Sequence, residues 1–85
     1  MIAYIDQWGP FIEGLDAKRR RDRLRSLGYL VRFNCGSREP ELSQLLIEAE
    51  TDATALEPAV AALNSLPLPT RKAILDAYTR LSEAT

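Results

Sequence analysis

The clearest alternation of apolar and polar positions lies in the segment that follows Pro40. Apolar residues recur there at i, i+3, i+4 and i+7, which is the spacing of one buried helical face. These positions are Leu42, Leu45, Leu46 and Ala49. The pattern predicts a helix with this face turned to the core and with charged and polar residues on its outer side.

A second helix is predicted after residue 52. Thr54 and Glu57 have the spacing of a capping box, which predicts a helix that begins near Thr54. Pro58 favours a start closer to itself, because proline is tolerated best in a first helical turn. Both alternatives place Leu56, Val60 and Leu63 on one apolar face.

The last helix is predicted to begin at Pro69. The Leu-Pro-Leu-Pro run at residues 66–69 favours an extended connection, and proline is common at a first helical position. The apolar face of this helix is predicted to contain Ile74, Leu75, Tyr78 and Leu81. The central core as a whole is predicted to consist of Leu45, Leu46, Val60, Leu63, Ile74, Leu75 and Tyr78.

The best-bounded element of the first half is a basic helix. Asp16 is a favourable N-cap for the run from Ala17 to Leu27, and Gly28 has the residue type that most often follows the end of a helix. Within this helix, Leu24 and Leu27 are predicted to point towards the core.

Residues 29–33 fit two structures. Their aromatic and β-branched side chains favour a strand, which needs a neighbour such as residues 2–5. The alternative is a helix that continues past Gly28, at a cost of about 1 kcal/mol for the interior glycine. Residues 1–7 fit a short helix or a strand, and residues 10–15 predict a helical turn. The fold is therefore predicted to be all-α, a compact bundle of four to five short helices. The alternative is an α+β fold in which residues 2–5 pair with residues 29–33.

Length and composition indicate one small globular domain spanning residues 1–85. The chain is 46% hydrophobic and 27% charged, with a net charge of −1. A core of this size is marginal, so we expect self-association, such as a homodimer, to bury further apolar surface. The lone Cys35 favours a reducing compartment, which predicts a cytoplasmic protein. We expect no membrane partner, because no apolar stretch is long enough to span a bilayer, and no secretory signal is visible.

The residue types present argue against catalysis. The chain has no histidine, so Ser/His/Asp and Cys/His catalytic arrangements and histidine zinc sites are not expected. Its four glycines are scattered and form no phosphate-binding loop, so no nucleotide cofactor is expected. Cys35, in a predicted turn, is interpreted as a structural residue. We expect a protein that is not an enzyme and carries neither cofactor nor metal.

Charge is distributed unevenly along the chain. Six of the eleven basic residues fall within one run of eight positions, and the stretch from residue 39 to residue 57 has six acidic residues and no basic one. We call the six cations the basic run; its members are Lys18, Arg19, Arg20, Arg21, Arg23 and Arg25. Because like charges repel, we expect these side chains to lie on a polar face opposite something negative.

Three kinds of partner fit the basic run: an acidic surface of another protein, nucleic-acid phosphates, or the acidic segment of this same chain. The net charge of −1 disfavours a dedicated nucleic-acid binder. Trp8 and Tyr29, with Tyr4 and Phe11, are predicted to supply an aromatic anchor or to close the end of the core. The predicted function is a protein-binding adaptor, regulator or inhibitor, and the alternative is a nucleic-acid-associated protein.

Residues 63–75, which read Leu-Asn-Ser-Leu-Pro-Leu-Pro followed by a basic, leucine-containing stretch, resemble the opening helix of the DNA-binding region 4 of sigma factors. No helix-turn-helix recognition helix is expected after them in this sequence. The chain is therefore not assigned to that family.

Overall fold

Four α-helices account for most of the chain in the computed structural model, which describes residues 10, 11 and 14–84. The helices are α1 (Ala17–Cys35), α2 (Pro40–Glu48), α3 (Leu56–Asn64) and α4 (Leu68–Ala84), with single 3-10 turns at η2 (Gly36–Arg38) and η3 (Ala53–Ala55). The described part of the chain contains no strand. The predicted all-α bundle is therefore confirmed, although α1 and α4, at 19 and 17 residues, are longer than expected.

Helix α1 begins where the sequence predicts and ends later. The Asp16 side chain caps it by accepting a hydrogen bond from the backbone N–H of Arg19 at 2.8 Å. The helix continues to Cys35, so the predicted stop at Gly28 and the strand alternative for residues 29–33 are wrong, and the alternative of a helix that continues past Gly28 is confirmed. Burial of Val31 and Cys35 outweighs the cost of an interior glycine. Residues 2–5, the predicted strand partner, lie outside the described residues.

A glycine does end α1, eight positions after the predicted one. Gly36 has a φ of +59°, a backbone conformation that glycine adopts at low cost, and its N–H donates to the carbonyl of Arg32. The Arg38 side chain donates to the carbonyl of Cys35 at 3.1 Å and to that of Asn34 at 3.3 Å. These bonds satisfy three carbonyls in the last turn of α1, just before the chain enters α2.

The predicted capping box at the start of α3 is wrong. Asp52 is the capping residue, and its carboxylate accepts hydrogen bonds from the backbone N–H of Thr54 at 3.0 Å and from its hydroxyl at 2.6 Å. These two bonds lower the pKa of the Asp52 carboxyl. The chain then passes through η3 and enters α3 at Leu56, so Pro58 lies in the first turn, where its missing N–H costs no hydrogen bond.

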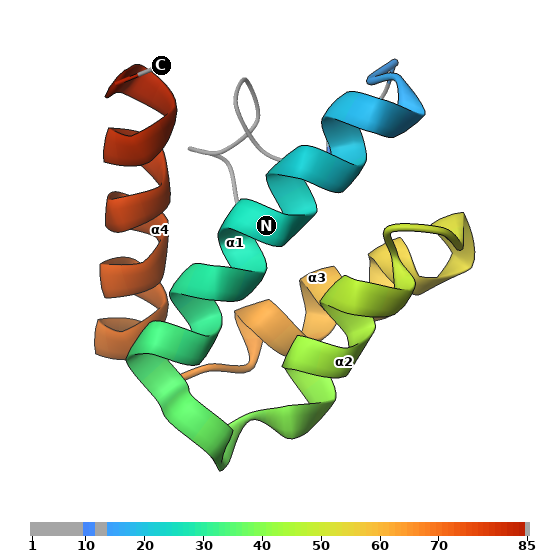
Figure 1. Ribbon diagram of the computed structural model, residues 1–85. Helices are drawn as coiled ribbons and strands as arrows, with labels where there is room; N and C mark the ends of the chain where they lie inside the picture. The colour runs from blue at the N-terminus through green and yellow to red at the C-terminus, as the bar shows by residue number, and fades with distance from the viewer. Residues whose placement is uncertain (1–9, 12–13, 85) are drawn as a thin grey trace.

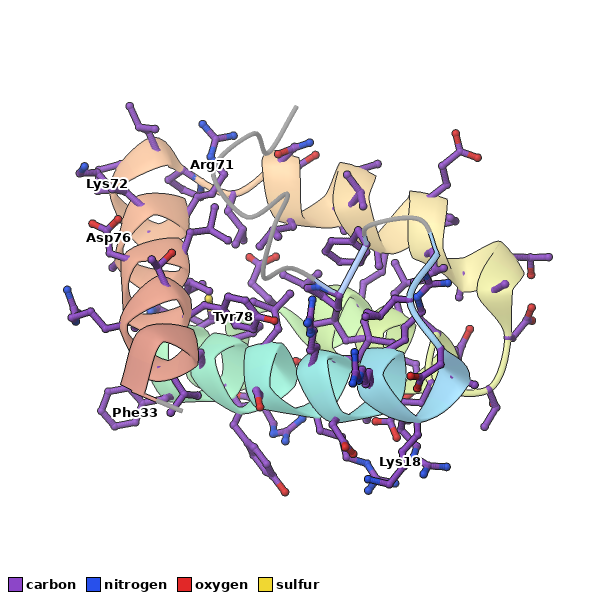
Figure 2. All side chains as sticks on the ribbon, turned by 90° about the horizontal axis from the view of Figure 1, so that it is seen from above. Lys18, Phe33, Arg71, Lys72, Asp76 and Tyr78 are labelled. Atoms are coloured by element: carbon purple, nitrogen blue, oxygen red, sulfur yellow. The ribbon has the colours of Figure 1, made fainter. Side chains whose placement is uncertain are left out.

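Helix α4 begins at Leu68, one residue before the predicted Pro69. Tyr78 points from this helix into the interior, whereas Lys72 and Asp76, whose charged groups are 3.8 Å apart, project from its outer side (Figure 2). Leu81 is 46% exposed, so its predicted place on the buried face is wrong.

The core lies where α1 packs against α4 on one side and against α2 on the other, with α3 packed on α2 (Figure 1). The radius of gyration is 11.6 Å, close to the roughly 12 Å typical of a compact chain of this length. The largest fully buried side chains are those of Tyr78, Leu24, Leu27, Leu42, Leu46, Leu63, Ile74, Leu75, Val31 and Pro10. Leu45 and Val60, predicted as central, are only half-buried against this cluster.

Candidate functional site

The basic run does not form one surface. Successive residues of a helix are rotated by about 100°, so a run of consecutive cations winds around α1. Lys18, Arg19 and Arg25 are exposed. Arg20, Arg21 and Arg23 are half-buried, so the expectation that the whole run lies on a polar face is wrong for these three residues. The position of Leu24 and Leu27 in the core fixes this rotation of the helix.

Each of the three exposed cations of the basic run has an acidic neighbour. Lys18 Nζ lies 3.5 Å from the Asp22 carboxylate, and Arg19 Nε lies 3.5 Å from that of Asp16. Arg25 Nε donates to the carboxylate of Glu50 at 2.9 Å, across the interface between α1 and the end of α2. Part of the predicted compensation by the acidic segment is therefore present within this chain.

The outer face of the C-terminal half of α1 is aromatic. Tyr29 is 65% exposed, and Phe33, one helical turn further on, is 87% exposed. The guanidinium carbon of Arg32 lies 5.0 Å from the centre of the Tyr29 ring, within the range of a cation–π interaction. Lys18 and Phe33 project from opposite ends of α1 on the same side of the molecule (Figure 2). We call Tyr29, Arg32 and Phe33 the aromatic face.

Of the aromatic residues singled out in the sequence, Tyr29 belongs to this face. Phe11 is half-buried against the core, and Trp8 and Tyr4 lie outside the described residues. Sequence reasoning missed Phe33 and Arg32 as site residues because it left residues 29–33 undecided between strand and helix. The i, i+4 spacing of Tyr29 and Phe33 would have revealed a shared outer face once the helix was continued.

A groove separates α1 from α2 beside the aromatic face. One hollow, of about 260 Å³, is lined by Leu24, Arg25, Gly28, Tyr29, Arg32, Leu46, Ile47 and Glu50. A second, shallower hollow, of about 460 Å³, is lined by Arg32, Gly36, Ser37, Pro40, Ser43, Gln44 and Ile47. Arg32 and Ile47 line both hollows, so the two hollows adjoin one another, and we call them together the α1–α2 groove.

The α1–α2 groove combines apolar walls with an excess of positive charge. Its charged lining residues are Arg25, Arg32 and Glu50, of which Arg25 and Glu50 neutralise one another. Among the described residues, no carboxylate lies within ion-pair distance of Arg32. Its guanidinium lies over the Tyr29 ring instead. The groove therefore offers a cation beside apolar surface.

Cys35 has the character of a core residue. It is the last residue of α1 and is buried, rather than lying in the predicted turn. Burial raises the pKa of its thiol, and the nearby Glu39 raises it further, against a smaller opposing effect of Arg38. A buried thiol with a raised pKa is a poor nucleophile at neutral pH.

Within the described residues, no helix has the length and apolar character needed to cross a membrane. The same part of the chain has no cluster of three or more His, Cys, Asp or Glu side chains placed to hold a metal ion. The aromatic face and the α1–α2 groove are therefore the features that we consider as a functional site.

No protein-family model matches this chain, and neither a curated protein nor a solved structure matches it. The functional interpretation therefore depends on the geometry and chemistry of the chain itself.

Proposed function

We propose that this protein is a small non-catalytic protein-binding module, acting as an adaptor, regulator or inhibitor, and that it binds through the aromatic face of α1 and the adjoining groove. The observation that carries the proposal is the exposure of Tyr29 and Phe33 side by side with Arg32. Aromatic residues and arginine are enriched at protein interfaces, and tyrosine and arginine are common among residues that dominate binding energy.

Charge supports a protein partner over nucleic acid. Binding to phosphates depends on cations whose counterions can be released, and Lys18, Arg19 and Arg25 already face carboxylates of this chain. The net charge is also −1. Arg32 has no carboxylate partner among the described residues, and it lines a hollow together with apolar side chains. This arrangement suits a protein with an acidic surface that also presents apolar side chains.

The proposal is tested by comparing which proteins of the source organism are captured by the wild-type chain and by a Tyr29→Ala/Phe33→Ala variant. Leu68→Ala is the matched control, because Leu68 is 63% exposed, belongs to α4 and lines neither hollow of the groove. We expect nuclease-treated extract to yield proteins that the control retains and that the double variant loses. Identical captured sets for all three chains would refute the proposal. Capture that disappears with nuclease treatment would favour the nucleic-acid alternative.

Self-association remains a separate prediction of the sequence. Phe33 on α1 and Ile47 on α2 are both exposed and offer apolar area for it. Light scattering over a range of concentrations tests it, and a mass of 9.5 kDa throughout would contradict it.

A further inference from the structure

Gly28 occupies a position where neither the backbone nor the packing of this chain calls for glycine. It lies inside α1 with an ordinary helical φ, unlike Gly14 and Gly36, whose φ values are positive. A Cβ added at Gly28 would meet only the Arg32 Nη1 atom, at 3.6 Å, which is an ordinary van der Waals contact. Alanine would therefore fit, and would favour the helix by about 1 kcal/mol.

The missing side chain leaves the α1–α2 groove open. Gly28 lines the 260 Å³ hollow together with Tyr29 and Ile47, so a larger residue at this position would project into that space. The adjoining 460 Å³ hollow is within the roughly 300–1,000 Å³ of typical small-molecule and cofactor sites but is shallow, whereas the hollow at Gly28 is smaller than that range. Its size and partly apolar lining suit a side chain of another protein rather than a whole cofactor.

Charge identifies the kind of protein. Arg32 lines both hollows and has no carboxylate partner among the described residues, so it is placed to meet an acidic group brought by the occupant. A second copy of this chain that docked through its own groove would be a poor occupant. In a twofold pairing of identical surfaces, each positive groove would meet another positive groove.

The backbone N–H and C=O groups of the occupant also need hydrogen-bond partners. The described residues offer no strand edge to pair with an extended peptide. A helix satisfies its own backbone hydrogen bonds and is the usual occupant of a groove between two helices, with anchors at i, i+3, i+4 and i+7.

We infer that the α1–α2 groove receives an acidic amphipathic helix of a partner protein. One apolar side chain of that helix lies over Gly28 between Tyr29 and Ile47, and a carboxylate pairs with Arg32. This inference rests on the proposed function and adds the class of partner and the way in which it docks.

The inference is tested by selecting binders of the full chain from a displayed library of helical peptides. We expect the selected peptides to share apolar residues at helical spacing and an acidic residue at a fixed position beside them. Gly28→Gln, which fills the groove, and Arg32→Glu, which reverses its charge, should each weaken binding at least about tenfold. A lysine in place of the shared carboxylate should restore binding to the Arg32→Glu variant.

Ala61→Gln and Arg80→Glu are the matched controls, because both residues are exposed on α3 and α4 and neither lines the groove. They should change affinity by no more than about twofold. Glutamine favours a helix more than glycine does, so Gly28→Gln should fold. Gly28→Ala is a second variant that should also weaken binding, and its melting temperature shows whether it is folded.

Selected peptides without a shared acidic residue, or binding that neither groove variant weakens, would overturn the inference. A homodimer that Gly28→Gln dissociates would also overturn it, by identifying a second copy as the occupant. Capture of native partners that requires Phe33 but survives Gly28→Gln and Arg32→Glu would leave the proposed function in place and remove the groove from it.

Discussion

The two halves of α1 differ in how their outer surfaces are used by the fold. In the N-terminal half, the exposed cations Lys18, Arg19 and Arg25 all face carboxylates of the same chain. In the C-terminal half, Tyr29 and Phe33 are exposed, and Arg32 has an aromatic ring as its neighbour rather than a carboxylate.

This difference shows that a dense run of charge is a weaker sign of a binding surface than its composition suggests. Part of the basic run is used by the fold itself, through ion pairs and the partial burial of Arg20, Arg21 and Arg23. The C-terminal half has fewer charges but leaves large apolar side chains in water. Variants in the two halves of α1 test this contrast.

The largest effect is expected from the buried side of α1. Leu27 is fully buried, so Leu27→Ala should lower the free energy of unfolding by about 2–5 kcal/mol. Phe33→Ala, six residues further along on the outer face, should change it by no more than about 0.5 kcal/mol. Urea denaturation measures both, and comparable losses would show that Phe33 belongs to the core.

Charge reversal in the N-terminal half should separate half-buried from exposed cations. Arg20→Glu/Arg21→Glu/Arg23→Glu should lower stability by at least about 1 kcal/mol, because three partly buried side chains change charge and shape. Lys18→Glu/Arg19→Glu should cost less, since both side chains are exposed and an acidic residue suits the first turn of a helix. Thermal melting compares the two variants, and an unchanged triple variant would contradict the observed burial.

A smaller effect is expected at the ion pair that joins α1 to the end of α2. Glu50 is 15% exposed, so Glu50→Gln should cost up to about 1 kcal/mol at low salt, and less at high salt. Asp22→Asn, which breaks the exposed pair with Lys18, should cost close to nothing. Equal losses of stability for the two variants, independent of salt, would show that the Arg25–Glu50 pair stabilises the fold no more than the exposed pair does.

The smallest effect is expected at Cys35, which is buried at the end of the C-terminal half of α1. Because burial raises the pKa of this thiol, the protein should react with a thiol reagent more slowly than free cysteine at neutral pH. Its thiolate should form only above the ordinary cysteine pKa, and the charged form then opposes folding, so stability should fall as the pH rises through the raised value. If the thiol of the folded protein reacted as fast as that of the protein unfolded in urea, the burial of Cys35 would be contradicted.

Most of the fold followed from patterns that the sequence displays. The apolar spacing at Leu42, Leu46 and Ala49 predicted α2 correctly, and Asp16 predicted the start of α1. The sequence left the end of α1 open, because Gly28 and the aromatic and β-branched residues at 29–33 are local signals for a stop and a strand. Burial of Val31 and Cys35 against other helices overrode them, and local propensity does not contain that information.

The candidate site was less predictable than the fold, for the same reason. Tyr29 was identified, but Phe33, Arg32 and Gly28 come together only after α1 is known to continue and α2 to pack beside it. The partial burial of Arg20, Arg21 and Arg23 depends on the rotation of α1 about its axis. That rotation is set by the contacts of α1 with α2 and α4, which sequence spacing alone does not determine.

A quantitative capture experiment decides whether the aromatic half of α1, rather than its basic half, carries binding. Wild type, Tyr29→Ala/Phe33→Ala and Lys18→Glu/Arg19→Glu are compared in the same extract, with folding checked by circular dichroism. We predict that the aromatic variant loses the captured proteins and that the charge-reversed variant keeps them. Loss in the charge-reversed variant alone, with capture retained by the aromatic variant, would contradict the account.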